Sequence, residues 1–160
     1  MKKTIFLFVL WSSIAVVTTG LGLALAAARE LNLSEPQTIA MILGTYEGKW
    51  IDHRSNRNGS LFVNFSVNPH NGDKPFRREA KVVGASTIDP NRASLLGGKI
   101  DQNKLVFSHA SGWSKYKFYE ENGRIKARGE FRYETGPMAG SGGTHELLKV
   151  EEASQTPKQQ

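Results

Sequence analysis

A period-2 alternation of apolar and polar residues recurs from about residue 45 to residue 150, and it restricts the fold more than any other feature. In the clearest run, 124–133, every second residue is apolar or small and the residues between them are charged. Successive side chains of a β-strand point to opposite faces, so this pattern predicts strands with one buried face. Eight such runs are expected, at about 45–51, 61–67, 76–88, 96–100, 105–109, 115–119, 124–133 and 144–150.

Short polar or glycine-containing segments join these runs. Asn122-Gly123 lies between two alternating runs and is typical of a tight hairpin, and Asn58-Gly59 predicts a turn after the first strand. An antiparallel meander hides its edges by closing on itself, and eight strands is a common number for closure. The predicted fold class is therefore all-β, an eight-stranded antiparallel meander closed as a small barrel. The alternative is a two-sheet β-sandwich, favoured if the glycine-rich segment 136–143 crosses between sheets.

One short helix is expected before the first strand. Ser34 is a suitable N-cap, Pro36 fits the first turn, and Gln37 takes the third position of a capping box. Residues 39–43 give an apolar face, and Gly44 is placed to end the helix. The preceding segment, 29–33, is expected to be a polar connector.

Residues 1–28 have the features of a Sec-type leader. Lys2 and Lys3 precede a long apolar run that ends in small residues at 24–28, as at a signal-peptide cleavage site. An uncleaved anchor in the inner membrane is the alternative, because the apolar run 4–28 is long enough to span a bilayer. Both alternatives place the domain 29–150 outside the cytoplasm, as a periplasmic or secreted protein or one held at the membrane. Residues 151–160 are expected to be a disordered tail.

The residue types present favour binding over catalysis. The chain has no cysteine, which excludes disulfides, thiol nucleophiles and thiolate metal sites. The four histidines, at positions 53, 70, 109 and 145, lack the short spacing of a metal site, and Gly140-Ser141-Gly142 opens no helix as a nucleophile elbow would. We therefore expect a non-enzymatic protein without a metal or other cofactor.

Gly48-Lys49-Trp50, on the first strand after a short helix, carries a resemblance to a known group. The layout resembles the calycin superfamily, which includes lipocalins, fatty-acid-binding proteins and avidin-like barrels. The resemblance implies that Trp50 packs across the closed end of the barrel. It also implies a basic residue stacked on this ring, for which Lys149 and Arg132 are the two candidates.

The leading functional prediction is an exported barrel that binds a small apolar or amphiphilic ligand, such as a lipid. Apolar side chains expected to face inward would line its cavity. These candidate ligand-binding residues are Val63, Phe65, Val82, Phe107, Phe118, Ile125, Phe131 and Tyr133.

The alternative is a solid-cored interaction domain that contacts anionic lipid or glycan near the membrane. The chain has a net charge of +6, and basic residues gather on the polar faces of two neighbouring runs, near Tyr119. Nucleic acid is not expected as a partner, because the domain is exported. The candidate contact residues are Lys115, Lys117, Arg124, Lys126, Arg128 and Arg132.

Overall fold

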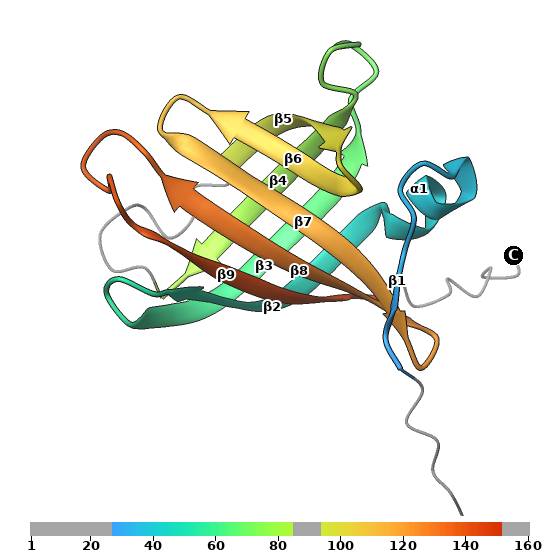
Figure 1. Cartoon of the computed structure of the whole chain (residues 1–160), viewed down its shortest axis with the longest axis horizontal. Coiled ribbons are helices and arrows are strands. Elements are labelled where there is room, and N and C mark those ends of the chain that lie inside the picture. Colours follow the sequence, from blue (N-terminus) through green and yellow to red (C-terminus); the bar gives the residue numbers. More distant parts are fainter. Residues whose placement is uncertain (1–26, 85–93, 152–160) are drawn as a thin grey trace, which may run out of the picture.

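The computed structural model describes residues 27–84 and 94–151, and they form a closed antiparallel β-barrel (Figure 1). Each strand pairs with the next along the chain, and the last pairs with the first of the meander, which closes the sheet. The predicted fold class is confirmed, and the barrel is compatible with a calycin-like architecture. The barrel strands are β2 (Gly44–Asp52), β3 (Arg57–Val67), β4 (Phe76–Val83), β5 (Ser94–Asp101), β6 (Lys104–His109), β7 (Gly112–Glu121), β8 (Arg124–Tyr133) and β9 (Gly142–Lys149).

Some predictions fall outside the described residues. The end of the expected 76–88 strand and nearly all of the leader and tail lie there. Among residues 27–84 and 94–151, no helix is both long and apolar enough to cross a bilayer.

An aromatic cluster fills the barrel near one end. Phe65 makes ring contacts with Tyr46, Phe107, Tyr116 and Phe118, with centroids 5.0–5.9 Å apart. These five side chains are at most 1% exposed. Tyr46 and Phe65 come from β2 and β3 and the other three rings from β6 and β7, so the cluster ties opposite walls of the barrel together.

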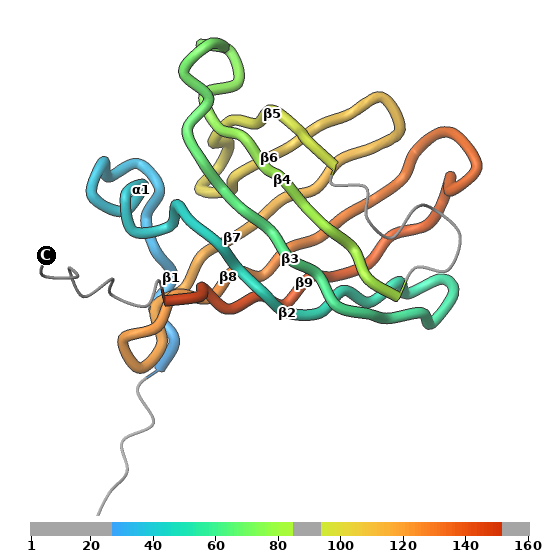
Figure 2. The backbone as a smooth tube through the Cα atoms, turned by 180° about the vertical axis from the view of Figure 1, so that it is seen from behind, coloured from blue at the N-terminus to red at the C-terminus, as the bar shows by residue number. Residues whose placement is uncertain are grey.

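The same end is covered by β1 (Arg29–Glu30) and α1 (Pro36–Ile42), as Figures 1 and 2 show. The prediction of a polar connector at 29–33 was wrong: β1 pairs with β7, and Leu31 and Leu33 are 4% and 2% exposed. The prediction missed them because an isolated Leu-x-Leu pair has no periodic context. Both leucines belong to the same core cluster as Tyr46.

The start of α1 differs from the expected capping box. Its N-cap is Glu35, which makes no side-chain cap hydrogen bond, and Pro36 occupies the first turn as predicted. The Ser34 hydroxyl instead donates to the Asn32 side chain. The Ser34 hydroxyl is therefore engaged locally with Asn32 and does not cap the helix.

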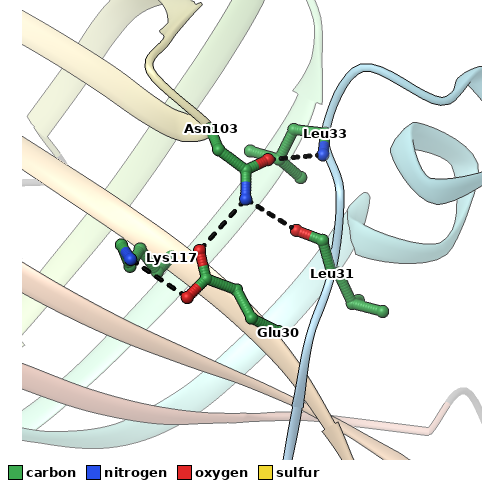
Figure 3. Close-up of polar contacts among 5 residues, drawn as sticks. All are labelled: Glu30, Leu31, Leu33, Asn103 and Lys117. Atoms are coloured by element: carbon green, nitrogen blue, oxygen red, sulfur yellow. Dashed lines mark hydrogen bonds and ion pairs between the residues drawn. The ribbon is translucent and has the colours of Figure 1, made fainter.

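Asn103, in the β5–β6 turn, holds the N-terminal segment in place (Figure 3). Its Oδ1 accepts a hydrogen bond from the Leu33 amide at 2.7 Å. Its Nδ2 donates to the Leu31 carbonyl and to the Glu30 carboxylate, at 3.1 and 3.0 Å. One side chain thus makes hydrogen bonds with three groups of the N-terminal segment, in which only Arg29 and Glu30 pair with a barrel strand.

Replacing Asn103 by glycine is expected to loosen this segment. The substitution keeps the positive φ of 59° accessible while removing all three hydrogen bonds. Amide hydrogen exchange should become faster at Leu33, whose amide loses its acceptor. Gln102→Gly is the control, because Gln102 also has positive φ, at 47°, and is exposed. Equal Leu33 protection in both variants would contradict this role.

The predicted turn at Asn58-Gly59 was wrong. Both residues lie within β3, paired with Ile51 and Trp50, and the turn lies earlier, with Asn56 at a φ of 52°. A Cβ on Gly59 would lie 2.1 Å from the Val83 carbonyl oxygen and 2.7 Å from the Trp50 indole nitrogen. This glycine therefore permits a close approach between strands rather than a reversal.

Trp50 does not lie at the helix-covered end. It is six residues along β2 from Gly44, near the opposite end, and its indole donates to the Val83 carbonyl at 3.2 Å. Tyr46 takes the position beside the helix, and its hydroxyl donates to the Ile42 carbonyl at 2.8 Å. Two basic residues were expected as stacking partners of the Trp50 ring. In the strand register, Lys149 lies opposite Tyr46 and Arg132 lies opposite Trp113.

Phe65 should contribute far more to stability than its neighbour Phe62. Phe65 is 1% exposed at the centre of the aromatic cluster, whereas Phe62 is on the outer face of the same strand and 42% exposed. Phe65→Ala should lower the free energy of unfolding by about 3–5 kcal/mol, and Phe62→Ala by about 1 kcal/mol or less. Urea denaturation measures both, and similar losses would contradict this packing.

Candidate functional site

The eight predicted ligand-binding residues separate into two groups in the structure. Val63, Phe65, Phe107 and Phe118 are at most 1% exposed within the aromatic core. Because these rings pack on one another, this half of the interior is occupied by side chains. Ligand binding here would require the core to rearrange.

The other four lie towards the rims of the barrel. Ile125 packs against the edge of the core at the helix-covered end. Val82 is 37% exposed near the opposite end, which β1 and α1 do not cover and which is called the open end below. Phe131 and Tyr133 are half-buried and contact each other, with centroids 6.1 Å apart. The structure therefore brings Phe131 and Tyr133 together but leaves Val82 separate.

Between these groups lies a buried arginine that the sequence prediction missed. Arg78 of β4 is only 8% exposed and extends across the interior towards β7. Its guanidinium donates to the hydroxyls of Ser114, Tyr116 and Ser94, at 2.7, 3.2 and 3.0 Å. The alternation of β4 could have revealed it, because Arg78 shares a face with Phe76 and Ala80.

Arg78 has only neutral partners among the residues that the structure describes. The three described ion pairs all lie elsewhere. Its Nε has no hydrogen-bond partner, and the guanidinium carbon lies 5.8 Å from the centroid of the Phe107 ring. A buried charge is costly unless it is paired, so the environment of this side chain is incomplete.

His145 of β9 lies beside the same group. It is 8% exposed and stacks between Tyr116 and Phe131, with centroids 5.6 and 4.9 Å away. Gly129 makes room for this arrangement, since a Cβ there would lie 2.7 Å from the Tyr116 ring and 3.0 Å from His145 Nδ1. Nδ1 has no hydrogen-bond partner among the described residues.

Burial, and then the nearby positive charge of Arg78, lower the pKa of His145 to about 3. The same two causes lower the pKa of His109, whose ring lies with its centroid 5.7 Å from that of Tyr133. Both histidines are therefore neutral in the folded protein at neutral pH. The interior charge of this region is that of Arg78.

The buried neutral state of His145 predicts a pH dependence of stability. Its folded pKa lies below the ordinary value of 6.5, so the unfolded chain binds more protons as the pH falls between 6.5 and 3. The free energy of unfolding should fall over this window, at up to about 1.4 kcal/mol per pH unit from this residue. His145→Gln should flatten the profile between pH 6.5 and 4.5 in urea denaturation. His70→Gln, in an exposed loop, is the control, and parallel profiles for all three proteins would contradict the assignment.

A groove of about 280 Å³ lies on the outer face of the barrel, across β6 to β9. Four cationic side chains line it together with Tyr119, and Glu130 and Glu146 also contribute carboxylates. Gly129, Thr144 and His145 complete the lining. The four cations are Lys104, Lys115, Lys117 and Arg128.

Three of the six predicted surface-contact residues thus converge on one concave site, and the other three do not. Lys126 forms an ion pair with Glu121. Arg124 is exposed at the β7–β8 hairpin, and Arg132 is exposed opposite Trp113. The sequence prediction did not include Lys104, because the strand expected there began at residue 105, whereas β6 begins at Lys104.

Neighbouring side chains hold the groove cations in position. Lys117 forms a 3.0 Å ion pair with Glu30 of β1, and this hydrogen bond raises the pKa of Lys117 (Figure 3). The Lys115 ammonium lies 4.4 Å from the centroid of the Trp113 ring. Arg128 lies 5.1 Å from that of Tyr119. Lys115 and Arg128 are thus positioned by aromatic rings. Neither of them belongs to any of the three ion pairs in the described residues.

The remaining polar residues at the open end have structural partners. Asp52 is buried, and its carboxylate accepts hydrogen bonds from the Arg54 amide, at 2.8 Å, and from the Ser141 hydroxyl. Ser141 therefore joins two loops. In residues 27–84 and 94–151, no three His, Asp or Glu side chains gather as metal ligands.

Comparison with known proteins gives no relative: no family model, no curated protein and no solved structure matches this chain.

Proposed function

We propose that this protein is an exported, non-catalytic barrel that binds anionic lipid headgroups through its outer basic groove. The observation that carries the proposal is the convergence of Lys104, Lys115, Lys117 and Arg128 on one concavity. Phosphate oxygens accept hydrogen bonds from both ammonium and guanidinium groups, and several cations close together favour such a group. Tyr119 adds an amphipathic ring suited to a membrane interface.

The position of the groove supports a membrane as the source of this headgroup. Lys117, which lines the groove, forms an ion pair with Glu30 of β1, and β1 pairs with β7. β1 begins at Arg29, directly after the predicted leader or anchor of residues 1–28. If that segment stays in the membrane, β1 links it to Lys117 of the groove through the ion pair with Glu30.

A second candidate function is the one predicted first, the binding of a small apolar or amphiphilic ligand inside a calycin-like barrel. The half-buried pair Phe131 and Tyr133 supports it, because these rings give the open end an apolar surface. The filled aromatic half of the interior limits such a ligand to the open half. This leaves the outer groove as the better-supported site.

Binding to anionic vesicles tests the proposal. The double variant Lys115→Gln/Arg128→Gln should bind vesicles of three parts phosphatidylcholine to one part phosphatidylglycerol about 10- to 30-fold more weakly, since each cation near the surface contributes about 1 kcal/mol. Arg77→Gln/Lys81→Gln is the matched control, removing two exposed cations from the outer face of β4. Binding of the wild type should weaken steeply as salt is raised from 0.05 to 0.5 M.

Equal vesicle affinity of the two double variants would contradict the groove as the contact. A wild-type protein that ignores phosphatidylglycerol but binds an anionic polysaccharide through the same residues would assign the groove to glycan instead.

A further inference from the structure

We propose that the barrel interior contains a second, separate binding site, in which Arg78 binds the carboxylate of a small organic anion beside His145. Arg78 lies on the inward face of β4 and its partners Ser114 and Tyr116 on the inward face of β7. None of these three residues lines the outer groove, which borders this cluster only at His145. The inference rests on the internal geometry and is independent of lipid binding.

The first argument is the uncompensated charge. Arginine stays protonated in proteins, so Arg78 carries a full positive charge while only 8% exposed. Three neutral hydroxyl acceptors do not neutralise it, and no carboxylate of the described residues forms an ion pair with it. Buried charges in proteins are generally paired, so an anion is the missing component.

The second argument comes from the hydrogen-bond donors. A guanidinium has five N–H donors, and three of those of Arg78 are used. The two that remain include Nε–H, which is buried without an acceptor. Two remaining donors on a planar guanidinium match the two oxygens of a carboxylate, the usual bidentate partner of arginine.

The groups around Arg78 can also donate to an anion. Ser94, Ser114 and Tyr116 each accept from the arginine and keep their own O–H hydrogen. His145, which stacks on Tyr116, has a buried Nδ1 without a partner and supplies a further donor in the Nδ1–H tautomer. The site thus combines one cation with several hydroxyl donors, a composition suited to an oxyanion.

Position in the barrel gives the ligand a route and limits its size. Ser94 is exposed while its hydroxyl bonds to Arg78, so the cluster reaches solvent at the start of β5. Beyond this point, Val82 and Val83 of β4 are 37% and 39% exposed. The aromatic core closes the other side, so any apolar part of the ligand extends towards the open end, where Phe131 and Tyr133 lie.

Isothermal titration calorimetry of the purified protein in chloride-free buffer tests the proposal, with sodium acetate, butyrate and octanoate as probes. Each carboxylate that binds should also raise Tm in a thermal unfolding experiment, by about 5–11 °C at 100 times its Kd. Affinity that is constant along the series indicates a free small carboxylate, and affinity that rises with chain length indicates an amphiphile. Acetamide and octanol, which lack the charge, are the matched neutral probes and should not bind measurably.

Arg78→Met removes the charge at nearly constant volume and should weaken carboxylate binding at least 30-fold. This variant should fold, because replacing a buried charge by an apolar side chain is often neutral or stabilising. Arg77→Met, on the exposed face of the same strand, should bind like the wild type. The groove variant Lys115→Gln/Arg128→Gln should also keep full carboxylate affinity, which separates the two sites.

Failure of all three carboxylates to bind the wild type would overturn the proposal, as would equal binding by a folded Arg78→Met variant. A carboxylate of the chain itself is the competing explanation for the arginine, and Asp89, outside the described residues, is the one to test. Strong coupling between Asp89→Asn and Arg78→Met in a double-mutant cycle of stability, with no carboxylate binding, would assign the charge to that pair instead.

Discussion

The pairing of β9 with β2 is the interaction on which the rest of this structure depends. Seven residue pairs, from Tyr46 with Lys149 to Asp52 with Gly143, join the two ends of the meander and turn eight strands into a tube. Closure leaves no edge between these strands, and it directs every inward face at the same narrow space. Because strand alternation is strict, each residue of an inward face must then be accommodated there, whatever its polarity.

This constraint explains the two halves of the interior. At the end covered by β1 and α1, large rings meet and leave the space filled, with Phe65 in contact with four others. Further along, the same register places Arg78 and His145 inside. A fold selected only for stability would gain from apolar residues at these two positions. Barrel closure thus places both residues of the proposed interior site inside the same tube.

The outer surface uses the complementary face of the same strands. Lys115, Lys117 and Arg128 point outward because Tyr116, Phe118 and Ala127 point inward. The groove that they form therefore depends on the same register as the core. The groove cations and Arg78 lie on opposite faces of one sheet, so their substitutions test the two proposals separately, although His145 borders both sites.

The sequence by itself determined the eight barrel strands, apart from the start of β3, and the hairpin at Asn122-Gly123. These depend on a local period of two and on backbone conformations that few residues adopt. It could not decide the role of Gly59, the burial of Leu31 and Leu33, or the location of Trp50 relative to the helix. Only the tertiary structure decided these, because each depends on contacts between residues far apart in the chain. The same holds for both candidate sites: the alternation places Arg78 on an inward face, but only closure shows that it meets hydroxyls of β7 rather than a carboxylate.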